Sequence, residues 1–461
     1  MSTDAAIAAN RFGFGARPGD LDRLGGRARE ALLAQLTGPA PLLNDAALPG
    51  SRQLLAQIDA QRKEAQTGAV KLAQLLRDVF APAYAADVAA RVRQAVTSDR
   101  DFAERLVHFW SNHFAVSIDK AAVLGLAGTM EREAIRPHVL GRFSDLLLAV
   151  EQHPAMLLYL DNQQSIGPNS PLAKLADRRG RDLGLNENLG REILELHTLG
   201  VDAGYTQDDV RALATMITGW SIGGGAAQAR GLAAQLRGGG EPGAFYFRAA
   251  FHEPGSRQLL GRRYGEDGLA QGVNALRDLA VNAHTARHVS TKLARHFVAD
   301  DPPPALVDRM THAWMQSQGD LPAVYRALIN SPESWQQPLA KYKTPTDYLY
   351  SAFRMLALPL QGRAQEIRMF EMLGQRAFAP GSPAGWPDRS ADWDGSSALL
   401  KRLELAQQLG QRLGTNRDAG KVAEATLAPV LSTETRASIA RAEDGAQALT
   451  LLLAAPEFMR R

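Results

Sequence analysis

Helical periodicity runs through most of this 461-residue sequence and constrains its fold more than any other feature. Apolar residues recur at steps of three and four, which places them on one face of an amphipathic helix. The pattern predicts helices over residues 50–95, 101–114, 121–150, 207–218, 268–298, 304–330, 345–358, 396–413 and 433–455. We therefore predict a mainly α protein with a large multi-helix globular fold.

Local signals mark several of the expected helix starts. Thr206 stands three residues before Asp209, and Ser98 stands three residues before Asp101. A hydroxyl followed three residues later by an acidic side chain is typical of a helix N-cap. The sequence therefore predicts helices that begin just after Ser98 and just after Thr206.

Strand signals are few. The strongest lies in Gly243–Phe251, with Gln258–Leu260 as a partner, and this pattern predicts a small β-hairpin near 243–260. Residues 223–243 contain eight glycines and predict a flexible loop. We predict a single helical domain over 1–461. A subdivision, if present, falls near 223–243 and separates residues 1–222 from residues 244–461.

Composition excludes several kinds of site and partner. The chain has no cysteine, which excludes disulfides, thiol nucleophiles and cysteine-ligated metals. Its net charge of +3 is too small and too dispersed to favour nucleic acid. No apolar run is long enough to span a membrane, and Met1-Ser2-Thr3-Asp4 does not resemble a signal peptide. The sequence as it stands predicts a cytoplasmic protein, with export to the periplasm as the alternative.

The densest group of polar residues lies in the segment Asn186–Gly200. Apolar residues at helical spacing predict one short helix whose stripe faces a core. Asn188, Glu192 and Glu195 line the adjacent face, at steps of four and three. Oxygen ligands at this spacing can bind a hard divalent cation such as calcium, magnesium or manganese. Glu192 and Glu195 are also candidates for acid–base catalysis.

The same segment also permits a structural interpretation. Arg191 stands four residues from Glu187 and from Glu195, the spacing of helical ion pairs. We assign Arg191 and His197 either to binding an anionic substrate or to a structural network. The segment is thus either a ligand site in a cleft or a buried charge network that locks helices together.

Two further histidines are candidate catalytic groups. His108 shares a helix face with Arg105, whereas His113 lies on an aromatic face and is expected in the core. His252 stands beside Glu253 in a turn, where a scaffold can position it for chemistry. The alternative is a solvated turn histidine. Neither His-Glu-x-x-His nor Glu-x-x-His occurs, which excludes the usual helical zinc and di-iron patterns.

A basic helix face and a tryptophan-rich loop complete the candidates. The loop spans 379–395, and its two tryptophans predict an ordered segment packed on the body. Trp386 within it is assigned to substrate binding or to the network. The basic face, at steps of four, four and three, consists of His284, His288, Lys292 and Arg295. It can hold an anion, neutralise the glutamates of segment 186–200, or simply face solvent.

These motifs, in their order along the chain, resemble domain-of-unknown-function family 1800. They are Arg11-Phe-Gly-Phe-Gly, His108-Phe-Trp-Ser-Asn-His-Phe, Asn186-Glu-Asn through His197-Thr-Leu-Gly-Val, Gly204-Tyr-Thr-Gln-Asp-Asp-Val, Thr218-Gly-Trp, His284-Thr-Ala-Arg-His, Lys292-Leu-Ala-Arg-His-Phe-Val, Lys343-Thr-Pro and Gly385-Trp-Pro-Asp. The resemblance implies a bacterial protein of unknown activity, often exported and often encoded beside a sulfatase-like protein. The chain departs from the family pattern at Glu253 and Arg257, where Asp and Lys are usual.

Two functional hypotheses follow. In the first, the protein is an enzyme or a metal-dependent protein that acts on an unknown, cell-surface substrate. Its polar cleft would be formed by Asn188, Glu192, Glu195 and His108. In the second, it is a non-catalytic binding or assembly partner of the sulfatase-like protein, and the polar cluster is a structural network.

Overall fold

The computed structural model of the protein describes residues 2–43, 45–65, 72–178, 183–224, 239–336, 339–358 and 363–461. The predicted mainly α fold is confirmed, because 61% of the structure is helical. The described residues form 23 α-helices and two small antiparallel sheets of two strands each. Most of the predicted glycine-rich loop, residues 225–238, lies outside the described residues. None of the described helices combines the length and apolar character needed to cross a membrane.

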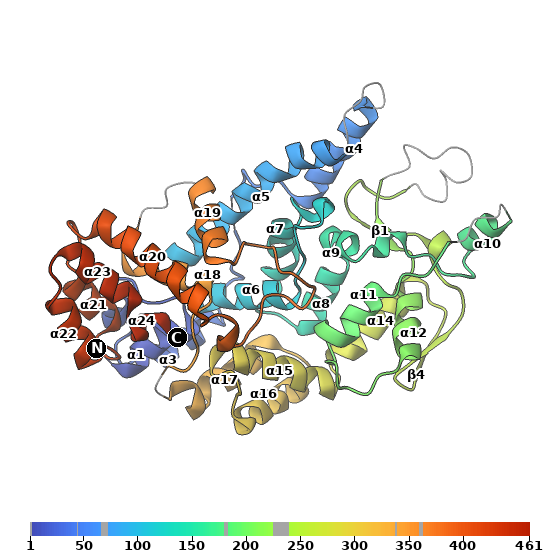
Figure 1. The fold of residues 1–461 in the computed structure, drawn as a ribbon. Coiled ribbons are helices and arrows are strands. Elements are labelled where there is room, and N and C mark those ends of the chain that lie inside the picture. The colour runs from blue at the N-terminus through green and yellow to red at the C-terminus, as the bar shows by residue number, and fades with distance from the viewer. Residues whose placement is uncertain are drawn as a thin grey trace.

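The first helices of the chain lie beside its last helices, at one end of the molecule (Figure 1). The N-terminal group is α1 (Thr3–Ile7), the π-helix η1 (Ala8–Phe12), α2 (Asp20–Leu24) and α3 (Ala28–Gln35). The C-terminal group is α20 (Ser396–Leu413), α21 (Ala419–Leu427), α22 (Thr433–Ala440), α23 (Gly445–Ala454) and α24 (Pro456–Met459). Both ends of the chain thus belong to one part of the fold.

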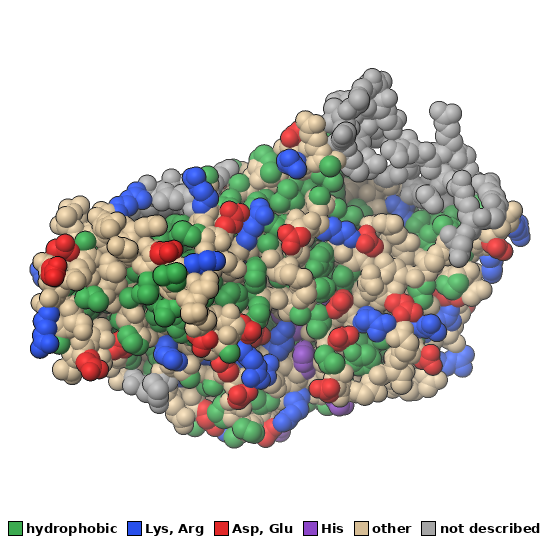
Figure 2. Space-filling model, viewed as in Figure 1, with side chains coloured by type: hydrophobic (Ala, Val, Ile, Leu, Met, Phe, Trp, Pro, Cys, Tyr) green, Lys and Arg blue, Asp and Glu red, His purple; other side chains and the backbone are tan. Residues whose placement is uncertain are grey.

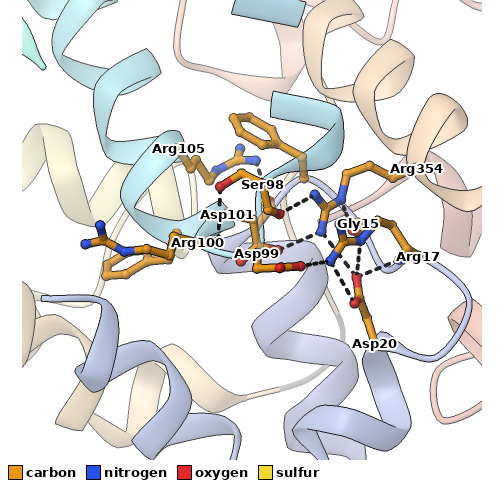
Figure 3. A network of polar contacts seen from close by, with 12 residues as sticks. Gly15, Arg17, Asp20, Ser98, Asp99, Arg100, Asp101, Arg105 and Arg354 are labelled. Atoms are coloured by element: carbon orange, nitrogen blue, oxygen red, sulfur yellow. Dashed lines mark hydrogen bonds and ion pairs between the residues drawn. The ribbon is translucent and has the colours of Figure 1, made fainter. Parts of the chain in front are cut away.

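Arg354 fastens the N-terminal turn to the rest of the molecule (Figure 3). It lies on α18 (Pro345–Met355), and its fully buried side chain donates a 2.7 Å hydrogen bond to the Gly15 carbonyl. The same guanidinium forms ion pairs with Asp20 and Asp101. A buried guanidinium is stable only when its donors are satisfied. These bonds therefore fix the Arg-Phe-Gly-Phe-Gly turn against α18.

The helices that follow in the first half of the chain lie in the middle of the molecule and towards the end away from the two termini (Figure 1). They are α4 (Ser51–Ala65), α5 (Leu72–Thr97), α6 (Asp101–His113), the 3₁₀ turn η2 (Ala121–Val123), α7 (Ala127–Met130), the π-helix η3 (Glu131–Ile135), α8 (Phe143–Glu151), α9 (Pro154–Tyr159), η4 (Asn162–Gln164), α10 (Pro171–Asp177), α11 (Asn188–Glu192), the π-helix η5 (Ile193–His197) and α12 (Gln207–Met216). The helix predicted over 121–150 is interrupted before α8. Pro137 explains the break, because proline cannot donate the helical hydrogen bond.

Helices of the second half lie on more than one side of the molecule (Figure 1). They are α14 (Leu269–Ala280), α15 (Ala283–Phe297), α16 (Pro304–Ser317), α17 (Leu321–Asn330), the 3₁₀ turn η8 (Pro332–Trp335), α19 (Arg363–Leu373) and η9 (Ser390–Asp392). The predicted helix over 268–298 is divided at Asn282, whose side chain accepts a hydrogen bond from His284 N. Asp320 likewise caps α17 and divides the helix predicted over 304–330. Both divisions follow from capping side chains.

The capping predictions have different outcomes. Thr206 and Asp209 form a capping box at the start of α12, as predicted. Ser98 does not cap α6, which begins after Arg100. The Gln35 side-chain oxygen instead accepts hydrogen bonds from the Phe102 and Ala103 amides in the first turn of α6. A distant side chain thus satisfies donors that the sequence assigned to Ser98.

The predicted β-structure occurs as two separate pairs. Strand β1 (Trp220–Ile222) pairs with β2 (Phe245–Phe247), and the 3₁₀ turn η7 (Ala249–Phe251) follows. Strand β3 (Arg257–Leu259) pairs with β4 (Arg262–Tyr264) rather than with the strand near 245. Leu260 and Gly261 both have positive φ, as a two-residue hairpin turn requires. This turn explains why β3 pairs with the segment just after it.

A cluster of buried apolar residues extends from Ala5 to Met459. It contains residues from both sides of the possible boundary at 223–243, such as Trp220 and Leu259. Strands β1 and β2 also pair across that boundary. The prediction of a single domain stays a prediction, and these contacts support it.

Candidate functional site

Segment 186–200 folds as one continuous helical element, α11 followed by η5. The Asn186 side chain accepts a hydrogen bond from Asn188 N and so satisfies a free amide at the start of the helix. Leu189 and Ile193 are fully buried, as the predicted apolar stripe requires. The second half is a π-helix, and such segments occur frequently at functional sites.

Two distant histidines hold the C-terminal end of η5. The His113 Nε2 atom lies 3.1 Å from the His197 carbonyl, and His288 Nε2 lies 3.2 Å from the Leu196 carbonyl. Each ring donates to a carbonyl that has no partner inside the helix. Gly200 has a φ of +90°, and a Cβ there would lie only 2.7 Å from His288 Nδ1. The glycine therefore permits both the turn and the position of His288.

The His197 side chain belongs to a buried pair. Its Nδ1 atom lies 2.7 Å from Glu151 Oε1, and the side chains are 1% and 0% exposed. Glu151 ends α8, so this hydrogen bond joins α8 to η5. His197 thus occupies a structural network, one of the two roles predicted for it.

The three predicted metal ligands lie outside this network. Glu192 and Glu195 are half-buried and Asn188 is exposed. Within the described residues, neither glutamate forms a hydrogen bond or an ion pair. Burial raises the pKa of Glu192, by more than the neighbouring His197 lowers it. The described part of the chain contains no group of three His, Asp or Glu side chains suited to a metal, and a divalent cation here stays a prediction.

Arg191 and His252 have identified partners. Arg191 forms a surface ion pair of 3.2 Å with Glu187, four residues earlier, as the spacing predicted. His252 is buried, and its Nδ1 lies 3.0 Å from the Thr218 carbonyl. Beside it, Glu253 forms an ion pair of 3.1 Å with Arg257. These contacts stabilise the turn, and they preserve the charge pattern expected from the family despite both substitutions.

The basic face of α15 lines an open cleft of about 740 Å³. The other walls are the turn at 199–203 and the loop at 382–392. Lys, Arg and His side chains gather on the face drawn in Figure 2, over the region where α15 lies in Figure 1. The basic residues that line the cleft are His284, Arg287, His288, Lys292, Arg295 and Arg389, and the acidic residues are Asp202, Asp388 and Asp392. Six of these nine positions carry or can carry positive charge, which favours an anionic ligand.

Lys292 differs from the other cations of this cleft. Arg287 forms an ion pair with Asp308, and Arg295 donates to the Asp300 carbonyl. Lys292 forms no hydrogen bond or ion pair with any residue in the described ranges. Burial lowers its pKa, although the charge of Asp388 opposes this. Its ammonium group is therefore available to a ligand.

Trp386 is fixed in the wall of the cleft by α6. The Trp386 amide donates a 2.7 Å hydrogen bond to Asn112 Oδ1, and the Asn112 side chain donates a 2.9 Å bond to the Trp386 carbonyl. Gly385 has a φ of +85°, and a Cβ there would lie 2.3 Å from the Asn112 carbonyl oxygen. The Gly-Trp-Pro-Asp loop thus packs on the body, as predicted, and presents Trp386 to the cleft.

The structure brings together some of the predicted site residues and separates others. His288, Lys292, Arg295 and Trp386 meet at the cleft, whereas His108 lines a second cavity beyond the Trp386 segment. Glu192, Glu195, Asn188, Arg191 and His252 are absent from the walls of both. Asp388 and Glu151 were not among the predicted site residues. Asp388 lies in the recognised loop, but Glu151 carries no local signal of its role.

Comparisons with known proteins place the chain in a family without assigning an activity. Searches of curated proteins and of solved structures found no match. A family described as "protein of unknown function (DUF1800)" matches residues 7–460, which is nearly the entire sequence. The resemblance drawn from the motifs is thereby confirmed, and the chain belongs to the DUF1800 family.

Proposed function

We propose that this protein is an enzyme that binds an anionic substrate in the basic cleft, with Lys292 at its centre. The availability of Lys292 carries the proposal. Its side chain is half-buried and has no described hydrogen-bonding partner, and it lines an open cleft. An unpaired, desolvated cation is costly unless a ligand supplies the opposite charge.

The surrounding groups supply further substrate contacts and acid–base chemistry. The Trp386 ring offers a flat surface against which the uncharged part of a substrate can pack. Asp388 lines the same cleft, and its negative charge raises the pKa of Lys292. A lysine of lowered pKa beside a carboxylate is a common acid–base arrangement in enzymes. In this proposal Lys292 binds the anionic group and exchanges a proton with the reacting group nearby.

Titration calorimetry with phosphate, sulfate and a short polyuronate tests the binding step. We expect binding by the wild-type protein, a large loss in Lys292→Met and retention in Lys292→Arg, which keeps the charge. Arg326→Met removes an exposed cation on α17, outside the cleft, and serves as the matched control. Binding that is equal in wild type and Lys292→Met would contradict the proposal.

Chromogenic phosphate, sulfate, carboxylate-ester and glycoside substrates then test catalysis. An activity that disappears in Lys292→Arg, while binding persists, would assign proton transfer to Lys292. If the wild type and Lys292→Met have the same activity on every one of these substrates, the proposal that the protein is an enzyme is contradicted.

A second candidate function is the binding partner of a sulfatase-like protein. It is favoured by one observation: His113, His197 and His288 all use ring nitrogens to hold η5 in place. In this case the polar motifs serve stability, and Lys292→Met would co-purify with the partner as well as the wild type does. Failure of the wild-type protein to co-purify would contradict this candidate.

A further inference from the structure

A second, more enclosed cavity lies next to the basic cleft. Trp386, Pro387 and Asp388 line both spaces, so this segment separates them. The inner cavity has room of about 90 Å³ for water-sized molecules, enough for a small ion or one functional group of a ligand. Its other walls include parts of α5, α6, α15 and α18, the segment 375–380 and the last residue of the sequence, Arg461.

Two buried arginines share one carboxylate at this cavity. Arg105 from α6 forms a 3.1 Å ion pair with Asp347, and Arg461 lies 2.8 Å from the same carboxylate. The Arg105, Asp347 and Arg461 side chains are 1%, 8% and 3% exposed. Among the described residues, no other carboxylate lies within 4.0 Å of either guanidinium. The three groups together therefore retain one positive charge.

The electrostatics of Asp347 agree with an excess of positive charge. Burial alone would raise the pKa of Asp347, but Arg105 and Arg461 lower it far below its ordinary value. Asp347 is thus ionised and already compensates one arginine. The other guanidinium has no described carboxylate of its own within ion-pair distance, and Asp388 on the cavity wall acts on Arg461 only through its charge at longer range. A buried guanidinium without a close counter-charge is unfavourable.

Unused hydrogen-bond donors point to the same conclusion. The Arg105 Nε atom is buried and has no hydrogen-bond partner. The Nε2 atom of His296, on the α15 wall, is likewise buried without a partner. Buried polar groups in folded proteins are normally satisfied by protein, water or ligand atoms. The unused donors of Arg105 and His296, and the net positive charge beside them, favour a negatively charged ligand with several oxygen acceptors.

We propose that the inner cavity is a binding site for a small oxyanion, the carboxylate of an organic acid or an inorganic phosphate or sulfate, held by Arg105, Arg461 and His296. The guanidinium groups supply charge-assisted hydrogen bonds, and Asp347 orients both of them. The Trp386–Asp388 segment separates this ligand from the open cleft. The site does not depend on what the basic cleft binds.

Thermal unfolding at constant ionic strength tests the proposal, with acetate, phosphate and sulfate as separate probes. We expect at least one probe to raise the Tm of the wild-type protein by a few degrees, since a ligand that binds only the folded state stabilises it. A larger effect of acetate identifies a carboxylate ligand, and a larger effect of phosphate or sulfate identifies an inorganic anion. No shift with any probe would overturn the proposal.

Two variants separate this site from the basic cleft. Lys292→Met, which removes a cation of the basic cleft, should keep an anion-dependent shift, while the double variant Lys292→Met/Arg461→Met should lose it. Without added anion, Arg461→Met should be at least as stable as the wild type, because the remaining Arg105–Asp347 pair is neutral. A shift that persists undiminished in the double variant, or that is already absent in Lys292→Met, would overturn the proposal. If Arg461→Met does not fold, crystals of the wild type soaked in selenate replace it. An anomalous peak within hydrogen-bond distance of Arg105 is then expected, and a cavity without such a peak would contradict the site.

Discussion

Glu151 and His197 form a hydrogen bond of 2.7 Å in the core, between side chains that are almost completely inaccessible to solvent. The bond joins the end of α8 to the end of η5, 46 residues later. The turn after η5 forms one wall of the basic cleft. The pair therefore fixes the position of that wall, although neither side chain lines the cleft.

Breaking this pair should destabilise the fold. His197→Phe leaves a buried Glu151 without its partner, and an unsatisfied buried group costs about 1–3 kcal/mol. Urea unfolding should show that loss in His197→Phe and in Glu151→Leu. The double variant should be more stable than the sum of the two losses predicts, because both polar groups are then removed. Strictly additive losses would contradict a direct interaction.

Gly200 should be more sensitive to substitution than Gly204, another glycine of positive φ. Alanine in the left-handed region costs about 1–2 kcal/mol. At Gly200 the added Cβ also overlaps the His288 ring, whereas at Gly204, with a φ of +77°, no atom lies within 4 Å of it. Gly200→Ala should therefore lose more stability than Gly204→Ala in the same urea titration. Equal losses would show that the His288 contact contributes nothing.

The sequence predicts features whose residues lie close together along the chain. It does not predict contacts between residues that are far apart in the sequence. Thr206 and Asp209 predict the start of α12 because the capping box lies within four residues. The basic face of α15 was recognised because helical spacing alone defines it. The role of His288 depends on a carbonyl 92 residues away, and Asp347 pairs with an arginine 242 residues earlier. No local pattern encodes such pairs, so the inner cavity could not be predicted.

The stability of a Glu192→Gln variant distinguishes a metal site from a structural network. Burial raises the pKa of this carboxyl, which means that its ionised form destabilises the folded state. The stability that the protonated Glu192 carboxyl contributes at acidic pH is lost as pH rises through its folded pKa. Glu192→Gln should therefore be as stable as the wild type at pH 7, or slightly more stable. A loss above about 1 kcal/mol would instead indicate a network that needs the carboxylate. Calcium, magnesium and manganese should then be added to both proteins. A rise in Tm that occurs in the wild type and not in Glu192→Gln would establish a metal site.

Lys343 should make stability depend on pH in the alkaline range. Its side chain is 1% exposed, and its ammonium lies over the Phe458 ring without a hydrogen-bond partner. Burial lowers its pKa to about 7, an effect that Asp347 only partly opposes. Between pH 7 and the unfolded value of 10.5 the unfolded chain binds a proton that the folded chain has released. Stability should therefore rise with pH across this window, and the destabilisation is fully present below pH 7.

A methionine at position 343 should remove both the destabilisation at pH 7 and the pH dependence that Lys343 causes. Lys343→Met should be more stable than the wild type at pH 7, by about 1–4 kcal/mol, and the difference should shrink towards pH 10. Lys341 provides a matched control two residues away, since it is equally buried but lies 2.5 Å from Asp300. Lys341→Met breaks an ion pair and should lose stability at pH 7. Urea unfolding of the three proteins from pH 6 to pH 10 measures these differences. If Lys343→Met follows the pH dependence of the wild type, the amine is charged in the folded protein and has a partner that neutralises it.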